Sequence, residues 1–151
     1  MAARKSVLPE WVRLVRDTRH PPPGGAPVRV RAPEDVGQTL AWLRDELVEV
    51  FVVLCLDSQS RITQCQEMTR GLLDSALVHP REVFRVAIAA GAAGIIVAHN
   101  HPSGDATPSP EDRAVTRGLV EAGRLLDIPL YDHVILAGPQ ELLSMAEAGL
   151  L

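Results

Sequence analysis

The sequence of 151 residues has few aromatic side chains and no long apolar run. Phe, Trp and Tyr make up 3% of it, so a core must be built from Val, Leu, Ile and Ala. The longest apolar stretch, residues 86–98, is too short to span a bilayer and contains two glycines, so no membrane association is expected. The N-terminus leads into polar sequence rather than an apolar signal segment, which predicts a cytoplasmic protein.

Cysteine is also scarce, and its two positions do not suggest a metal site. Cys55 and Cys65 are expected on neighbouring strands, and neither has the spacing of a zinc-binding cysteine pair. A disulfide between them is possible in principle. Two buried thiols are the expected state, because a reducing cytosol disfavours disulfides.

The first 26 residues carry a net positive charge, whereas the remainder is acidic. They contain five basic and two acidic side chains, while the whole chain has a net charge of −4, so residues 27–151 carry −7. This acidic balance argues against direct DNA binding by the larger part. The basic segment is either a solvated terminus or a contact for an acidic partner.

The Pro- and Gly-rich stretch at residues 20–25 separates two parts of the chain. Residues 1–26 combine this linker with a short amphipathic helix expected around Trp11. Residues 27–151 are expected to form one domain. The pattern leaves the oligomeric state open.

Within residues 27–151, apolar runs typical of buried strands alternate with amphipathic segments. A helix is expected from Pro33, with Val36, Leu40, Leu43 and Leu47 on its buried face. Further helices are expected from residues 79 and 110, the last reaching about residue 126 with Leu126 on its buried stripe, and strands at 28–31, 50–56, 61–69, 95–98 and 130–136, with a short helix or strand from 141. The alternation and the hairpin predict a single α/β sandwich with a mixed central sheet.

His99 and His101 follow the apolar strand at residues 95–98. Residues two apart in a strand point to the same face, so both imidazoles can reach one cation. The loop that follows ends at the start of the next helix, which supplies Asp112. Two imidazoles and one carboxylate leave one tetrahedral position open for water, as in a catalytic zinc site.

Each part of this pattern also has a simpler interpretation. Two histidines at a strand end are often polar loop residues. Ser109 and Asp112 fit a helix start, with Ser109 as N-cap and an acidic residue at the third helical position. Asp105 is an alternative third ligand on chemistry alone, although an exposed turn role suits it better.

A family resemblance selects among these interpretations. His99, His101, Pro102, Ser109 and Asp112 match the JAMM (MPN+) signature, His-x-His-Pro, six residues, then Ser-x-x-Asp. The fuller string resembles the RadC branch, as do residues 79–84 and 132–135, and the likeness covers about residues 27–151. It implies a JAB/MPN-like, cytidine-deaminase-like α/β sandwich. The 26 residues before it are too few for the helix-hairpin-helix domain of many RadC-like proteins.

The resemblance also implies an activity and its residues. Zn²⁺ is held by His99, His101 and Asp112, Glu49 acts as general base, and the Ser109 hydroxyl donates to the oxyanion. The expected function is a zinc-dependent peptidase or isopeptidase that cleaves an amide bond in a peptide or protein tail. The alternatives are a zinc-binding RadC-like module associated with DNA repair or defence, without turnover, and a metal-dependent nuclease.

The remaining histidines are given structural roles. His133 is expected in the core, bonded within its strand, with contact to the metal ligands as the alternative. His79 lies at a helix start and His20 in the linker, where both are expected to be structural or exposed.

Overall fold

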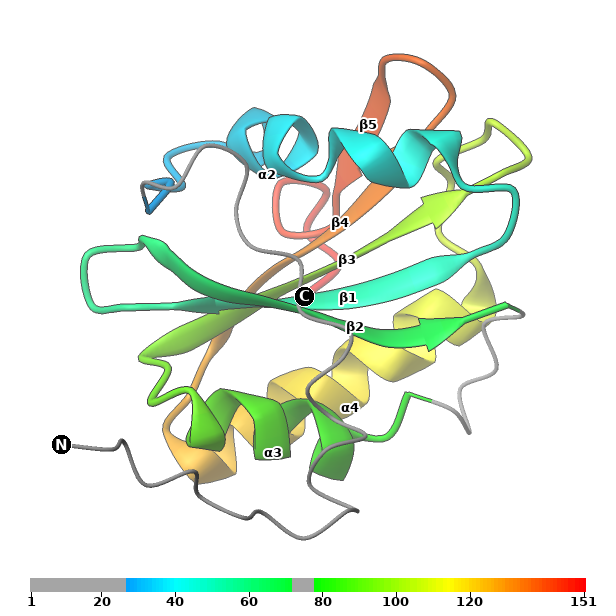
Figure 1. Cartoon of the computed structure of the whole chain (residues 1–151). Coiled ribbons are helices and arrows are strands. Elements are labelled where there is room, and N and C mark those ends of the chain that lie inside the picture. Colours follow the sequence, from blue (N-terminus) through cyan, green and yellow to red (C-terminus); the bar gives the residue numbers. More distant parts are fainter. Residues whose placement is uncertain (1–26, 72–77) are drawn as a thin grey trace, which may run out of the picture.

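In the computed structural model, which describes residues 27–71 and 78–151, the centre is a five-stranded sheet with the order β2-β1-β3-β4-β5 (Figure 1). The β3–β4 pair is parallel and the other three pairs are antiparallel. The predicted α/β fold with a mixed sheet is therefore confirmed. The strands are β1 (Val50–Leu56), β2 (Ile62–Arg70), β3 (Gly94–His101), β4 (Leu130–Ala137) and β5 (Glu141–Ser144).

Helices cover both faces of this sheet (Figure 1). On one side lie α2 (Pro33–Thr39) and a short 3-10 helix, η1 (Ala41–Asp45); on the other lie α3 (Pro80–Ala89) and α4 (Pro110–Leu126). We call these the α2 face and the α4 face. Each has its own apolar cluster, so the sheet forms the shared wall of two cores.

The first strand shows how the sequence produces the two cores. β1 is buried along its whole length, as its continuous apolar run predicts. Because successive side chains of a strand point to opposite faces, the run divides between the clusters. The α2 face receives Val50, Val52, Leu54 and Leu56, and the α4 face receives Phe51, Val53 and Cys55.

The two cysteines follow the same rule. Cys55 belongs to the cluster on the α4 face and Cys65 to the cluster on the α2 face. Both are buried free thiols, as expected from the sequence. Their side chains lie on opposite faces of adjacent strands.

The segment before β1 departs from the prediction. The helix from Pro33 ends at Leu40 and residues 41–45 continue as a 3-10 helix, so the expected 3.6-residue periodicity is interrupted. Leu47, predicted to be buried, is 91% exposed for this reason. The predicted strand at 28–31 is reduced to one bridge between Arg29 and Arg61.

The end of α4 also differs from its predicted apolar stripe. Leu126 is 45% exposed, while Gly123 is buried. A Cβ at Gly123 would lie 2.6 Å from the carbonyl oxygen of Ile128, so the returning chain packs directly on the helix backbone. Asp127, in the left-handed conformation, ends the helix.

No helix in residues 27–71 and 78–151 is long and apolar enough to cross a membrane. The helix predicted around Trp11 and the linker containing His20 lie outside the described residues. His79 caps α3 as expected, its Nδ1 accepting from the Arg81 N–H at 3.1 Å.

Candidate metal centre

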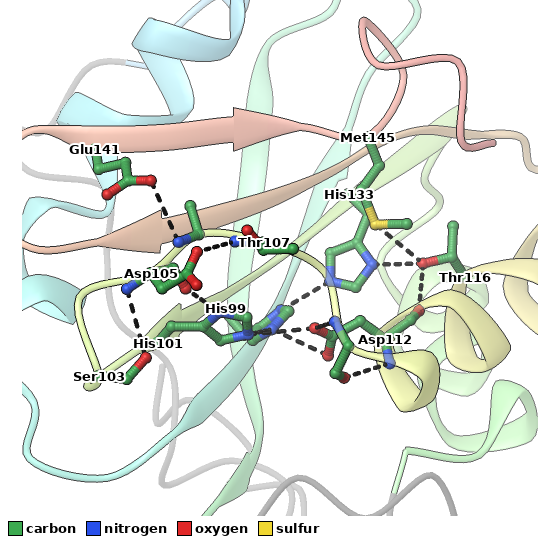
Figure 2. A network of polar contacts seen from close by, with 12 residues as sticks. His99, His101, Ser103, Asp105, Thr107, Asp112, Thr116, His133, Glu141 and Met145 are labelled. Atoms are coloured by element: carbon green, nitrogen blue, oxygen red, sulfur yellow. Dashed lines mark hydrogen bonds and ion pairs between the residues drawn. The ribbon is translucent and has the colours of Figure 1, made fainter.

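His99, His101 and Asp112 lie together at the carboxyl end of β3 (Figure 2). The two Nε2 atoms are 2.8 Å apart. Asp112 Oδ1 lies 3.2 Å from His99 Nε2, and Asp112 Oδ2 lies 3.2 Å from His101 Nε2. The structure thus brings the three ligands predicted from the sequence within reach of one metal ion.

Strand geometry and a helix cap together produce this convergence. β3 continues three residues beyond the predicted end and includes both histidines, which therefore share the α4 face. The chain turns at Gly104, whose φ is +86°, and enters α4 at Pro110. The first turn of α4 then presents Asp112 to the histidines.

Ser109 and Asp112 form the capping box suggested by the sequence. The Ser109 hydroxyl accepts from the Asp112 N–H at 3.0 Å, and the Ser109 N–H donates to Asp112 Oδ2 at 2.8 Å. One carboxylate therefore fixes the helix start and also reaches the histidines. The cap role of Asp112 is therefore present, and it is compatible with the predicted metal-ligand role of the same side chain.

The second ring nitrogen of each histidine is bonded away from the centre. His101 Nδ1 lies 2.7 Å from the backbone oxygen of Asp105, and His99 Nδ1 lies 2.8 Å from His133 Nε2. A carbonyl oxygen only accepts, so His101 Nδ1 carries the proton in its neutral ring and Nε2 presents a lone pair. This orientation is typical of histidines that bind metals.

The charge of Asp112 is stabilised although the residue is 1% exposed. Burial alone would raise its pKa, but the contacts with His101 and His99 outweigh burial and hold the pKa far below its usual range. Its Oδ1 is at ion-pair distance from His99 but has no hydrogen-bond donor among the described residues. Chiefly because of Asp112, the pKa of His101 is raised. Convergent lone pairs and an anionic, incompletely satisfied carboxylate fit a cation.

Glu49 lies beside this centre, immediately before β1. The antiparallel pairing of β1 with β3 ends at Phe51 and His99, and Glu49 lies two residues before Phe51, toward the end of the sheet that carries His101. Glu49 is half-buried, and its charge contributes to the raised pKa of His101. The Gly71 N–H donates to its backbone oxygen at 2.8 Å.

Asn100 was not singled out by the sequence analysis, yet it holds the segment that carries Glu49. Its side chain points to the opposite face from the two histidines. The amide oxygen accepts from the Val50 N–H at 2.7 Å, and the amide nitrogen donates to the oxygen of Val48 at 2.9 Å and of Glu46 at 3.4 Å. A polar residue between two histidines gives no signal of this role in the sequence alone.

Ser109 keeps a hydroxyl proton to donate. Its oxygen accepts from the backbone of Asp112, and among the described residues no acceptor for its proton is found. Ser109 is half-buried at the rim of the site.

Asp105 does not join the centre through its side chain. Its carboxylate is exposed and accepts from the Thr107 N–H at 2.9 Å, which together with the Thr107 hydroxyl lowers its pKa. Asp105 therefore has the exposed turn role expected from the sequence. The backbone oxygen of the same residue orients His101, a contribution that its side-chain type could not indicate.

His133 is completely buried, as the core interpretation requires, but its ring is not bonded within its own strand. It contacts His99 on β3 and, through Nδ1, the Thr116 hydroxyl on α4 at 2.7 Å (Figure 2). The alternative weighed for His133, contact with a metal ligand, describes this geometry.

A groove of about 260 Å³ opens next to the centre. His101 and Asn100 form part of its wall, Leu136 contributes an apolar surface, and the exposed Leu47 stands at its rim. Of the three candidate ligands, only His101 lines this groove.

Comparisons with known proteins agree with the fold. A family model described as the RadC-like JAB domain matches residues 30–150. A UPF0758 protein of Thioalkalivibrio sulfidiphilus is 50% identical over 121 residues, 80% of this chain and 53% of that protein. A UPF0758 protein of Desulforamulus reducens is 42% identical over 130 residues, 85% of this chain and 57% of that protein.

A third relative, from Thermotoga maritima, is 48% identical over 100 residues, 66% of this chain and 44% of that protein. The chain thus spans about half the length of the curated relatives it matches. With a family model covering residues 30–150 and identities of 42–50%, the chain belongs to the RadC-like JAB domain family.

Proposed function

We propose that this chain is a zinc-dependent metallohydrolase of the JAMM type, a peptidase or isopeptidase that cleaves an amide bond in a peptide or protein tail. The observation that carries the proposal is the convergence of three side chains: His99 Nε2 and His101 Nε2 are 2.8 Å apart, and each lies 3.2 Å from one of the two Asp112 carboxylate oxygens. Tetrahedral ligands about 2.0–2.2 Å from zinc are roughly 3.3 Å apart, so this donor set suits zinc with little rearrangement.

Three protein ligands leave a fourth position for water. A zinc ion held by these three ligands would lower the pKa of the water in the fourth position to about 7, and it would polarise a substrate carbonyl. Glu49, whose charge acts on His101, would accept the proton of the attacking water. Glu49 then delivers that proton to the leaving amine, as a general base that becomes a general acid.

Ser109 supplies the second contribution. Its free hydroxyl proton donates to the oxygen of the substrate carbonyl as negative charge develops there. One such donor is worth about 3 kcal/mol of transition-state stabilisation. The backbone of α4 holds the Ser109 oxygen in place, so the donor is oriented before substrate arrives.

The choice of amide over phosphate chemistry rests on charge and on the paired roles of Glu49 and Ser109. Residues 27–151 carry −7, which repels a polyanionic substrate. The groove beside His101, with the apolar Leu136 and Leu47, suits an extended peptide tail. A zinc-binding module of DNA repair or defence without turnover is the alternative.

Metal content is the first test. We expect about one zinc per wild-type chain and none in Asp112→Ala, because the variant loses the anionic ligand. A wild-type protein that takes up no zinc even when zinc is supplied would remove the hydrolase proposal.

Turnover is the second test, measured on peptides and on lysine-linked isopeptides. Glu49→Gln is expected to bind zinc as the wild type does and to lose about 10²–10⁴-fold in turnover. Glu34→Gln, an exposed carboxylate on α2, is the control and keeps full turnover. Normal turnover in Glu49→Gln would refute the assignment of the base. Zinc binding with no cleavage of any amide substrate would favour the module without turnover.

A further inference from the structure

A chain of buried polar contacts runs from His99 to the backbone of the helix that carries Asp112 (Figure 2). His99 Nδ1 is 2.8 Å from His133 Nε2, His133 Nδ1 is 2.7 Å from Thr116 Oγ1, and Thr116 Oγ1 is 2.7 Å from the Asp112 backbone oxygen. His99, His133 and Thr116 are each 0% exposed. The chain therefore joins β3, β4 and α4 without water.

The last group in the chain fixes the direction of every hydrogen bond. A backbone oxygen only accepts, so the Thr116 hydroxyl donates to Asp112, one turn earlier in the helix. The sulfur of Met145, 3.5 Å from the same hydroxyl, is also an acceptor and leaves this direction unchanged. With its one proton used, Thr116 must accept from His133 Nδ1.

The same reasoning passes through the imidazole of His133. A charged ring is disfavoured there, because it is fully buried and within residues 27–71 and 78–151 its polar contacts are His99 and Thr116. A neutral ring with its proton on Nδ1 has a lone pair on Nε2. His99 Nδ1 must then donate to it, which leaves the lone pair of His99 on Nε2, the atom that faces His101 and Asp112.

Two different hydrogen-bond acceptors therefore give His99 and His101 the same tautomer. For His101 the acceptor is the backbone oxygen of Asp105, and for His99 it is the side chain of His133. Phe51 packs against the pair formed by His99 and His133. Its ring is stacked on His99 at 6.0 Å and edge-on to His133 at 5.6 Å between centroids. Of the two acceptors, only the His133 side chain can be removed by substitution, because the acceptor for His101 is a backbone oxygen.

We propose that His133 and Thr116 are positioning residues that hold His99 in its metal-binding tautomer through a hydrogen-bond chain anchored on the Asp112 carbonyl. The inference rests on the proposed metal site and deepens it. No proton is gained or lost in the chain; its effect is to select which nitrogen of His99 is bare. Outer hydrogen-bond partners of this kind are typically worth 10–100-fold in metal affinity.

Four variants separate hydrogen bonding from packing. His133→Phe keeps a buried ring and removes the acceptor, whereas His133→Gln returns an acceptor oxygen the same number of bonds from the backbone. Thr116→Val removes only the hydroxyl, and Thr116→Ser restores it. Thr39→Val is the matched control, because Thr39 is also buried and also donates to the backbone oxygen four residues earlier, in α2.

The first measurement is the zinc dissociation constant, by competition with a chromophoric chelator at fixed pH. We expect His133→Phe to weaken zinc binding about 10–100-fold and Thr116→Val by a smaller factor of at least about threefold. His133→Gln and Thr116→Ser should recover most of the loss, and Thr39→Val should match the wild type. Thermal unfolding of each metal-free variant checks that it is folded.

The second measurement is the tautomer of His99 in the metal-free protein, read from the ¹⁵N chemical shifts of its ring. The wild type should carry the proton on Nδ1, and His133→Phe should lose this preference. Zinc affinity within twofold of the wild type in both His133→Phe and Thr116→Val would overturn the proposal. So would a wild-type His99 protonated on Nε2.

These readouts distinguish the inference from the proposed function. If the wild type bound no zinc, the hydrolase proposal would fail while the tautomer measurement still decided the role of His133. If zinc bound equally well in all variants, the metal site would stand and the positioning role would be wrong. A misfolded His133→Phe leaves the Thr116 pair and His133→Gln to give the answer.

Discussion

Buried polar side chains on the two faces of the sheet differ in how completely their hydrogen bonds are satisfied. On the α2 face, Asn100 and Asp132 have a partner for each side-chain polar atom: three backbone groups for Asn100, and two backbone N–H groups with the Ser144 hydroxyl for Asp132. On the α4 face, the chain from Thr116 ends at His99, whose Nε2 lies beside His101 and the incompletely satisfied carboxylate of Asp112.

This difference separates polar groups that serve the fold from polar groups that are available for chemistry. A buried polar atom that is not hydrogen-bonded costs free energy, so most are satisfied. At the α2 face that requirement is met inside the protein. At the carboxyl end of β3 on the α4 face a bound cation would meet it, which is why we propose that function is located there.

The largest expected effect is a loss of zinc affinity on replacing Asp112, which is compared with the same replacement of Asp35 in α2. Asp112→Asn should weaken zinc binding by at least about 100-fold, because it removes the anionic ligand while keeping an oxygen for the helix cap. Stability of the metal-free protein should change by about 1 kcal/mol or less. Zinc competition and urea unfolding measure the two quantities.

Asp35→Asn is the control for this variant. Asp35 occupies the same third position of α2 and accepts from the N–H of Ala32 and Arg31. The control should leave zinc affinity unchanged. Equal zinc losses in both variants would break the comparison of the faces.

Asn100→Ala should have the opposite pattern, a loss of stability with little change in zinc affinity. It leaves the Val50 N–H and the Val48 oxygen without their partner, at a cost of about 1–3 kcal/mol in the free energy of unfolding. Zinc affinity should change less than threefold, while turnover falls because Glu49 loses its fixed position. Urea unfolding of the metal-free protein and zinc competition, with the exposed Gln38→Ala as control, test this. A large zinc loss at unchanged stability would contradict it.

Ser109→Ala sharpens the comparison at the helix start. Loss of the N-cap should lower stability by about 1 kcal/mol, and loss of the hydroxyl donor should reduce turnover about 10²–10³-fold. Ser109→Thr keeps both functions and serves as the control. An alanine variant with the stability loss and full turnover would leave Ser109 as a cap alone.

The smallest effect concerns the thiols, one on each face. Burial raises the pKa of Cys55 to about 11 and of Cys65 to about 12, against 9.0 in an ordinary thiol. The unfolded chain therefore loses these protons first, so stability is unaffected below pH 8 and falls as pH rises through 9 toward the raised values. The two thiols together should cost less than about 1 kcal/mol between pH 8 and 9.

Urea unfolding across this pH range, for the wild type and for Cys55→Ala and Cys65→Ala, measures the slope. Each variant should remove a similar part of it, because both thiols are buried. Rapid alkylation of either cysteine in the native protein at pH 8 would show that one face opens.

Local pattern predicted the elements where a single rule dominates. The apolar run of β1, the hairpin and the extent of α4 from Pro110 to Leu126 agree with the structure. The prediction failed at Leu47 because a change from α to 3-10 helix alters the periodicity without any Pro or Gly to mark it. It was incomplete for β3, whose last three residues are polar yet paired with β4.

The sequence by itself determined the ligand set, since the spacing of His99 and His101 in a strand and the family pattern ending at Asp112 place three donors at one loop. Only the tertiary structure decided how those donors are oriented. His133 and Asn100 lie 34 and 50 residues from their partners His99 and Val50, and such contacts depend on strand order and register. No local rule fixes them, because hydrogen-bond direction in a buried network is set by the last acceptor, here a backbone carbonyl in α4.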